Sequence, residues 1–196
     1  MSDPRSEATE LADLVSRFDS EEKCRAFLEQ LRWPDGVRCP RCAAERGISR
    51  IEARSQFECD SCGYQFSVRA RTAFHASHLP LWKWLLAVYV MCESPNGVSA
   101  NQLRKLLGVS YKTAWYLCHR IRAAMKDDAP RGVSRSVLAR TAVGPHQHLS
   151  AKHLQAYVDE AAFRLRNRGN EHRLRDTLLR LLATRSIPYA ELVAND

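Results

Sequence analysis

The chain has 196 residues, 45% of them hydrophobic, which is enough to bury a core in one or two small domains. Its seven cysteines and its polar, acidic N-terminus predict neither a disulfide framework nor a secretory signal. The longest apolar run, residues 79–92, is interrupted by Lys83 and is too short to cross a bilayer. The sequence therefore predicts a soluble, cytoplasmic protein with no membrane partner.

The positive charge is concentrated in the middle of the chain. The formal net charge is +8, and residues 63–153 contain thirteen Lys and Arg and three acids, whereas residues 1–38 contain six bases and nine acids. A basic segment of this kind favours a polyanionic partner such as nucleic acid. Basic proteins without such a partner are also common, so net charge alone does not identify a site.

The first predicted element is a helix that follows a polar tail over residues 1–19. Asp19 or Ser20 can cap this helix, which is predicted to run to about Arg32. Cys24 lies on its apolar stripe and is predicted to be a packed thiol rather than a ligand. Residues 37–70 then predict short strands and tight turns, so that residues 20–72 form a helix followed by a small β module.

Four cysteines of this module form two Cys-x-x-Cys pairs, Cys39-Pro-Arg-Cys42 and Cys59-Asp-Ser-Cys62, sixteen residues apart. Each pair can place two thiolates on one tight turn, and Gly63 allows the second turn to close. Four thiolates complete a tetrahedral shell with no open position, which predicts one structural Zn²⁺ and no metal chemistry. Iron is the alternative metal, and four unrelated buried cysteines are the alternative to a metal site. The residues expected to pack behind the second pair are Phe57 and Phe66.

A further helix is predicted over residues 81–92, with Pro80 at its start. It is apolar on most sides, so we expect it to be buried, including Trp82 and Trp84. Cys92 in this helix and Cys118 later in the chain are predicted to be packed thiols.

Two helices joined by a short turn are predicted over residues 99–124. Ser99 and Gln102 form a capping-box pattern before a helix over residues 100–107, and Ser110 caps a second helix that runs to about residue 126. The lengths and the Gly108-Val-Ser turn are typical of a DNA-binding helix-turn-helix, in which the second helix reads the DNA. The side chains predicted to reach base edges are Ser110, Tyr111, Lys112, Thr113, Tyr116 and His119. Those predicted to face phosphates are Arg104, Lys105, Arg120 and Arg122. The alternative is an ordinary helical hairpin in a basic protein.

The remaining chain is predicted to be a linker followed by two helices. Residues 127–143 are rich in proline and glycine and form the linker, and residues 144–196 contain helices that Ser150 and Asn170 can cap. His146, His148 and His153 could be a second metal site, but surface or helix-packing roles are more common for histidines at such positions. The predicted fold is mainly α with a small β zinc ribbon: an N-terminal helix, the ribbon, a helix-turn-helix bundle over residues 73–126 and a C-terminal helical pair.

The order of these elements resembles the start of bacterial insertion-sequence transposases of the zinc-ribbon, ISXO-type (DDE) group. The resemblance covers about residues 20–126 and includes the segment Thr72-Ala-Phe-His-Ala-Ser-His-Leu-Pro-Leu-Trp82. It resumes over residues 144–168, which look like the segment that closes the catalytic domain of that group. Between these flanks, members of the group carry a ribonuclease-H-like domain whose acidic residues hold two magnesium ions for strand cleavage and joining.

The carboxylates for this chemistry are missing from the corresponding part of the chain. Two-metal phosphoryl transfer needs several carboxylates on one scaffold, and between Cys62 and Asp159 the acids are Glu93, Asp127 and Asp128. No catalytic residue can be carried over from the group. We therefore expect an internally deleted transposase with its junction at residues 127–143, which is not itself an enzyme.

The resemblance implies a zinc-dependent, nucleoid-associated protein that binds double-stranded DNA of transposon ends. It would act as a homodimer or beside an intact transposase. A decayed relic or a protein-interaction module is the alternative, and a chain that retains transposase activity in DNA transposition is the third hypothesis.

Overall fold

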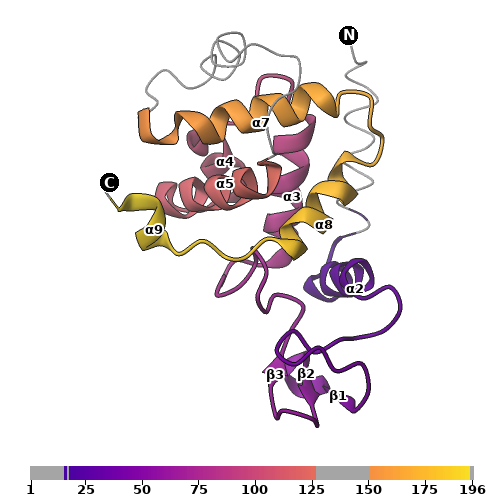
Figure 1. Ribbon diagram of the computed structural model, residues 1–196. Helices are drawn as coiled ribbons and strands as arrows, with labels where there is room; N and C mark the ends of the chain where they lie inside the picture. Colours follow the sequence, from indigo (N-terminus) through magenta and orange to yellow (C-terminus); the bar gives the residue numbers. More distant parts are fainter. Residues whose placement is uncertain (1–15, 17, 127–150, 195–196) are drawn as a thin grey trace. The chain divides into compact units, whose positions relative to one another are not determined.

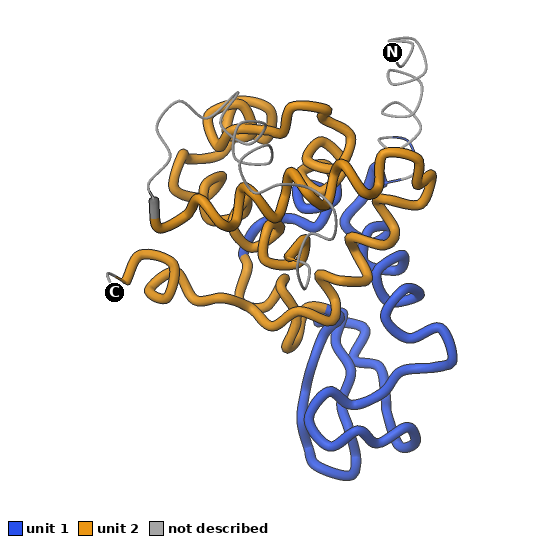
Figure 2. The backbone as a smooth tube through the Cα atoms, turned by 45° about the horizontal axis from the view of Figure 1, so that its top comes forward, with its two compact units in different colours: residues 1–68, 78–85 blue, residues 69–77, 86–196 orange. Residues whose placement is uncertain are grey.

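The structure, a computed structural model, describes residues 16, 18–126 and 151–194. They fall into two compact units (Figure 2), of which unit 1 is Met1–Val68 with His78–Leu85 and unit 2 is Arg69–Ser77 with Leu86–Asp196. The described elements are mainly helices with one three-stranded antiparallel sheet (Figure 1), which confirms the predicted fold class. None of the helices described is both long and apolar enough to span a bilayer.

Helix α2 (Glu21–Arg32) lies in unit 1, and of the two predicted caps, Asp19 and Ser20, its N-cap is Ser20. The Ser20 hydroxyl accepts a hydrogen bond from the backbone N–H of Lys23, which satisfies one of the free N–H groups of the first turn. Cys24 and Leu28, one turn apart, are fully buried, as the apolar stripe predicted. The Arg32 guanidinium donates to the Val68 carbonyl and so ties the end of α2 to the end of the β module.

The sheet of unit 1 has the strand order β1-β2-β3. Strand β1 (Ile48–Ile51) pairs antiparallel with β2 (Gln56–Cys59), and the short 3-10 helix η1 (Glu52–Arg54) connects the two strands. Strand β2 also pairs antiparallel with β3 (Gln65–Phe66). Phe57 and Phe66 are register partners, so their side chains share one face of the sheet.

Helix α3 (Leu81–Glu93) starts in unit 1 and continues in unit 2. The Glu21 carboxylate accepts a hydrogen bond from the Leu81 backbone N–H at 2.7 Å, where helix N-termini favour negative charge. Trp84 is buried as predicted, but Trp82 is 40% exposed and lies beneath the ammonium of Lys83. The expectation that both tryptophans are core residues is therefore wrong for Trp82, because two residues along a helix is a turn of about 200° and places them on opposite faces.

Unit 2 contains the helix pair that the sequence predicted, α4 (Ala100–Leu107) and α5 (Tyr111–Met125). The capping box of Ser99 and Gln102 is complete, and the Ser110 hydroxyl accepts from the Thr113 backbone N–H. Gly108 ends α4 in the left-handed region, at φ 59°, where a residue without Cβ is favoured.

The C-terminal helices pack on α5. The 3-10 helix η2 (Ala151–His153) leads into α7 (Leu154–Arg166), which contacts α5, as does α8 (Arg173–Ala183). A further short helix, α9 (Tyr189–Val193), follows them and was not predicted. Asn170 does not cap α8, whose N-cap is His172; its side chain instead accepts from the His172 N–H and donates to Asp176. Ser150, the other predicted cap, lies outside the described residues, as does the predicted linker.

Candidate metal centre and nucleic-acid interface

The two cysteine pairs of unit 1 form two turns of the same shape. The Cys39 N–H donates to the Ala44 carbonyl and the Cys59 N–H to the Tyr64 carbonyl, at 2.9 and 3.1 Å. The residue after each pair has a left-handed backbone, with φ 61° at Ala43 and 64° at Gly63. Gly63 therefore has the role predicted for it, whereas in the first turn an alanine bears the cost of the same conformation.

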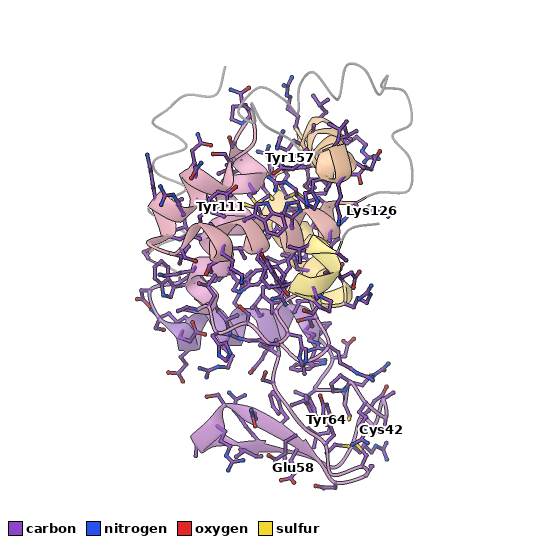
Figure 3. The ribbon with its side chains drawn as sticks, turned by 90° about the vertical axis from the view of Figure 1, so that its left-hand side faces the viewer. Cys42, Glu58, Tyr64, Tyr111, Lys126 and Tyr157 are labelled. Carbon is purple, nitrogen blue, oxygen red and sulfur yellow. The ribbon has the colours of Figure 1, made fainter. Side chains whose placement is uncertain are left out.

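The four sulfurs come together at the distances that one tetrahedral ion requires. Cys39 Sγ lies 3.7 Å from Cys62 Sγ and Cys42 Sγ lies 3.6 Å from Cys59 Sγ, and all four ligand atoms lie within 4.8 Å of one another. Sulfurs bound at about 2.3 Å to a tetrahedral zinc are about 3.8 Å apart. The four cysteines are thus positioned to bind one zinc ion (Figure 3 labels Cys42), and this shell leaves no position for a reacting ligand.

The thiols of the cluster need a cation to ionise together. Burial opposes ionisation of Cys39, but backbone amides that include the Arg41 N–H, 3.4 Å from its sulfur, lower its pKa to about 7. Desolvation and the neighbouring cysteine side chains raise the pKa of Cys62 to about 12. A divalent cation resolves this conflict, since it stabilises all four thiolates at once.

An aromatic cluster supports the sheet of the ribbon. Phe57 and Phe66 are buried with ring centroids 5.7 Å apart, and the Trp33 ring meets both edge-on at 5.5 and 5.9 Å. Trp33 follows α2 directly, so this packing also fixes the end of that helix.

The helix pair of unit 2 exposes a polar, basic surface at the start of α5 (Figure 3 labels Tyr111 at this end of the helix). Tyr111 is 50% exposed, and the other exposed residues predicted to contact DNA are Arg104, Lys105, Ser110, Lys112 and Thr113. No acid occurs in residues 99–126, which contain six Lys and Arg. The first turn of a recognition helix is the part that reaches base edges in helix-turn-helix proteins.

Other residues predicted to contact DNA point into the protein instead. His119 and Arg120 are each 3% exposed and Arg122 is 1% exposed, so none of the three is available on the surface of this structure. Tyr116 is partly buried, and its hydroxyl donates to the Ile187 carbonyl. Arg120 donates to the His75 carbonyl at 2.6 Å and to the Ser186 hydroxyl at 2.8 Å.

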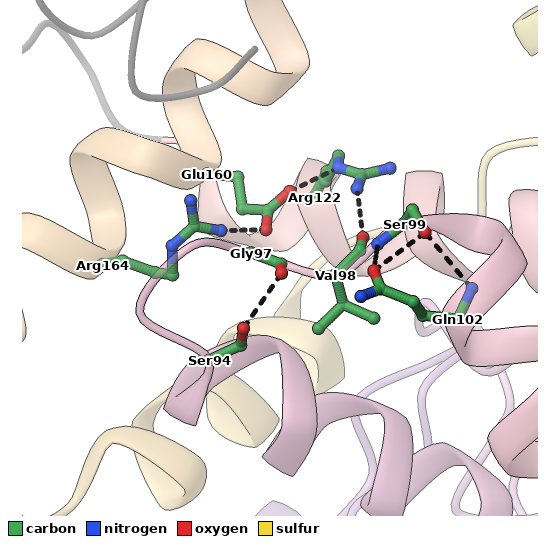
Figure 4. A network of polar contacts seen from close by, with 8 residues as sticks. All are labelled: Ser94, Gly97, Val98, Ser99, Gln102, Arg122, Glu160 and Arg164. Carbon is green, nitrogen blue, oxygen red and sulfur yellow. Dashed lines mark hydrogen bonds and ion pairs between the residues drawn. The ribbon is translucent and has the colours of Figure 1, made fainter. Parts of the chain in front are cut away.

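Arg122 belongs to a buried ionic network (Figure 4). Its Nε donates to Glu160 at 2.6 Å and its Nη2 to the Val98 carbonyl at 3.3 Å, while Arg164 donates to the other oxygen of Glu160. The guanidinium of Arg122 also lies 3.8 Å from the ring centroid of Tyr157. Coulombic attraction to Glu160 opposes the effect of burial and raises the pKa of Arg122. The network therefore links α5 to α7 through charges that are shielded from water.

His119 lies in a cluster of rings between α5 and the start of α7. Its ring centroid is 4.2 Å from Trp115, 4.6 Å from His153 and 6.0 Å from Tyr157. Burial, with the charge of Arg122 and the proximity of His153, lowers the pKa of His119 to about 3. His119 thus has a neutral packing role. Of the three histidines considered as a second metal site, His146 and His148 lie outside the described residues. Among the described residues, no third metal ligand lies beside His119 and His153.

Sequence reasoning missed the residues that decide which face of α5 is available. Glu160 lies within the apolar stripe of α7, and an acid in such a stripe is a signal for a buried partner. Nothing in the sequence identified the partner as Arg122, and α9 is too short to show a helical period.

The comparisons with known proteins agree with the ribbon. Residues 19–65 match the family described as the transposase zinc-ribbon domain. The chain is 36% identical over 119 residues to a protein of Halobacterium salinarum described as an uncharacterized protein in transposable element ISH50. The match covers 60% of this chain and 39% of that protein, so the chain spans about two fifths of the length of its relative. No solved structure matches the chain. The chain thus carries a transposase-type zinc ribbon and is related to a protein of a transposable element.

Proposed function

We propose that this chain is a transposase-derived protein that binds double-stranded DNA of transposon ends through α4 and α5 and does not itself catalyse transposition. The observation that carries the proposal is the exposed start of α5, which is basic, free of acids and preceded by a capped turn, in a chain with a transposase-type ribbon. Lys and Arg on such a surface neutralise phosphates, and polar side chains at the first turn of α5 reach base edges.

The DNA surface in this proposal is smaller than the ten residues suggested by the sequence. Arg104 and Lys105 at the end of α4 would contact phosphates, and Ser110, Tyr111, Lys112 and Thr113 would face the groove. We omit His119, Arg120 and Arg122 because they are buried against other parts of unit 2, and Tyr116 because it is partly buried and its hydroxyl donates to the Ile187 carbonyl.

A binding measurement tests the proposal directly. Fluorescence anisotropy at about 150 mM salt, where nonspecific binding is weak, compares a duplex taken from the ends of the element that encodes the chain with a shuffled duplex of equal length. We expect tighter binding to the first duplex, and equal affinity for both would refute recognition of transposon ends.

Substitutions on α5 locate the site. Lys112→Ala is expected to weaken binding by about tenfold or more, as the loss of one base contact does. The matched control is Lys23→Ala, which removes an exposed lysine from α2 in unit 1 and should leave the affinity unchanged. Equal effects of the two substitutions would mean that α5 does not read the DNA.

The non-catalytic part of the proposal has its own test. A supercoiled plasmid that carries both transposon ends is incubated with the chain and Mg²⁺, and we expect no nicked or linear product. Magnesium-dependent nicking by the purified chain would establish an enzyme instead.

We also propose that an internal deletion within residues 127–143 produced the chain from a longer transposase. The deletion is tested by aligning the encoding DNA with intact copies of the element in the same genome. A continuous alignment through this segment would rule the deletion out.

A further inference from the structure

The C-terminal segment of unit 2 lies along the face of α5 that carries Lys112 and Tyr116. We define residues 185–193 as the C-terminal strap; it includes α9. The Tyr116 hydroxyl donates to the Ile187 carbonyl, and the ammonium of Lys112 lies 4.4 Å from the ring centroid of Tyr189. The Tyr189 ring also meets Tyr116 edge-on at 5.8 Å and Trp115 at 6.1 Å.

These contacts fall on one stripe of the helix. Lys112, Trp115 and Tyr116 are separated by three and four residues, which places them side by side on α5. Lys112 and Tyr116 are both among the residues that the sequence predicted to reach base edges. The strap therefore lies beside the proposed DNA surface and contacts it at Lys112.

The strap is attached to α5 by polar contacts that precede Tyr189. The Ser186 hydroxyl accepts a hydrogen bond from Arg120, which is buried in α5. Within the strap, Glu191 accepts two hydrogen bonds from Arg185 at 3.1 and 2.9 Å, which fix the shape of the strap rather than its place on α5. Tyr189 nevertheless remains 37% exposed, as expected of a segment that can detach.

The size of the DNA groove makes the two arrangements exclusive. The major groove is about 12 Å wide, and an α-helix with its side chains is about 10–12 Å across, so a second segment packed along the side of the helix does not fit in the groove beside it. A lysine that lies over a tyrosine ring must also leave that ring before it reaches a base or a phosphate.

We propose that the C-terminal strap is an autoinhibitory element that holds Lys112 at the edge of the recognition surface of α5 and is displaced when DNA binds. This inference rests on the proposed function, because it assumes that α5 reads DNA. A covered site lowers the apparent affinity by the fraction of molecules in which the strap is open, so a strap that is docked in about nine of ten molecules weakens binding about tenfold.

The test measures DNA affinity of full-length variants that alter the strap without changing charge. Tyr189→Ala removes the ring that contacts Lys112, Trp115 and Tyr116, and it is expected to tighten binding to the transposon-end duplex about tenfold. Val193→Ala is the matched control, because Val193 is 44% exposed at the end of the same helix and its truncation should change affinity by less than about twofold.

A second readout follows the strap itself. Addition of the duplex to the unmodified chain should increase hydrogen exchange at residues 189–194, because the strap leaves α5. The exchange of these amides in Tyr189→Ala should be fast already without DNA.

The outcomes separate the two proposals. Suppose that the unmodified chain prefers the transposon-end duplex, that Tyr189→Ala leaves this affinity unchanged or weakens it, and that the strap exchanges slowly in the complex. These results would overturn autoinhibition, while the proposed function would stand. If neither the unmodified chain nor Tyr189→Ala prefers the transposon-end duplex, the proposed function itself fails, and the inference fails with it.

Discussion

Glu160 is the residue on which the packing of α5 against α7 depends most. It is 1% exposed and neutralises Arg122 and Arg164, which come from different helices. A buried charge is costly unless its partners compensate it, so each of these three residues is tolerated only while the others are present.

Glu160→Gln is expected to destabilise unit 2 by about 3 kcal/mol or more, because it leaves two buried guanidinium groups without a counter-charge. Urea denaturation followed by helical circular dichroism measures the change in the free energy of unfolding. Glu191→Gln is the control, since it removes an acid from the exposed pair with Arg185 and should cost less than about 1 kcal/mol. Similar losses for the two variants would contradict a buried role for Glu160.

His119 makes the stability of unit 2 dependent on pH. Its pKa is about 3 in the folded state, mainly because of burial, and 6.5 is the ordinary value for histidine. The folded state therefore binds the proton less well than the unfolded state does. The stability that neutral His119 contributes is complete above pH 6.5 and decreases as the pH falls from 6.5 toward 3.

This dependence amounts to about 2 kcal/mol between pH 6.5 and 5, at 1.36 kcal/mol per pH unit. The unfolding free energy of the unmodified chain minus that of His119→Leu should fall by about 2 kcal/mol as the pH is lowered across this interval, because leucine does not titrate. Parallel pH profiles for the two proteins would show that His119 is not protonated on unfolding.

At the scale of elements, the loop between α3 and α4 is adapted to the ionic network beneath it. Gly97 has φ 80°, and a Cβ added to it would lie 2.6 Å from Nη1 of Arg164, whose guanidinium Glu160 holds in place. Gly108 between α4 and α5 has φ 59°, but a Cβ added there would meet nothing within 4 Å. A substitution at Gly108 thus tests backbone strain alone, whereas a substitution at Gly97 tests backbone strain together with steric overlap.

Gly97→Ala is expected to cost about 2–3 kcal/mol, since it adds overlap with a fixed side chain to the strain of a left-handed alanine. Gly108→Ala carries the strain alone and should cost about 1 kcal/mol. Thermal unfolding of the two variants gives the comparison, and a smaller loss at Gly97 than at Gly108 would mean that Arg164 moves freely.

At the scale of the whole molecule, the two units are stabilised by different means. The ribbon in unit 1 has four cysteines and a small aromatic cluster, whereas unit 2 buries apolar residues from several helices, among them Leu103, Leu117, Ile121 and Phe163. A structural zinc site supplies much of the folding free energy of a small module, and a packed helical core does not need it.

Removal of the metal is therefore expected to unfold the ribbon and to leave the helices of unit 2 folded. Elemental analysis should give one zinc per chain, and hydrogen exchange after chelation should rise at residues 48–66 but not in α5. Cys59→Ser should lose the metal, whereas Cys24→Ser should keep it, because Cys24 is buried in α2 away from the four ligands. A metal-free chain with an intact ribbon would contradict this.

The buried apolar residues of α7 and α8 are covered by other helices of unit 2. Tyr157, Val158, Ala161 and Ala162 form a buried cluster with Leu154 at its edge, and α5 contacts both helices. Their apolar stripes are buried within unit 2 itself.

The sequence alone determined the features that depend on neighbouring residues. The four zinc ligands follow from the spacing of two tight turns, and the caps at Ser20, Ser99 and Ser110 follow from hydrogen bonds that span three residues. The bounds of α2, α4 and α5 agree with the predicted ranges for the same reason, because capping and helical period act within a few residues.

Only the tertiary structure decided how far the buried side of α5 extends. The apolar residues Ala114, Leu117, Cys118, Ile121 and Met125 mark one side of the helix at helical spacing. The spacing does not distinguish a surface arginine from the buried Arg122, which pairs with Glu160 thirty-eight positions later. The contact of α5 with the C-terminal strap likewise joins residues about seventy positions apart. Such pairs are selected by the packing of whole helices and by the cost of leaving a charge unpaired in the interior, and neither is encoded in the local spacing of residues.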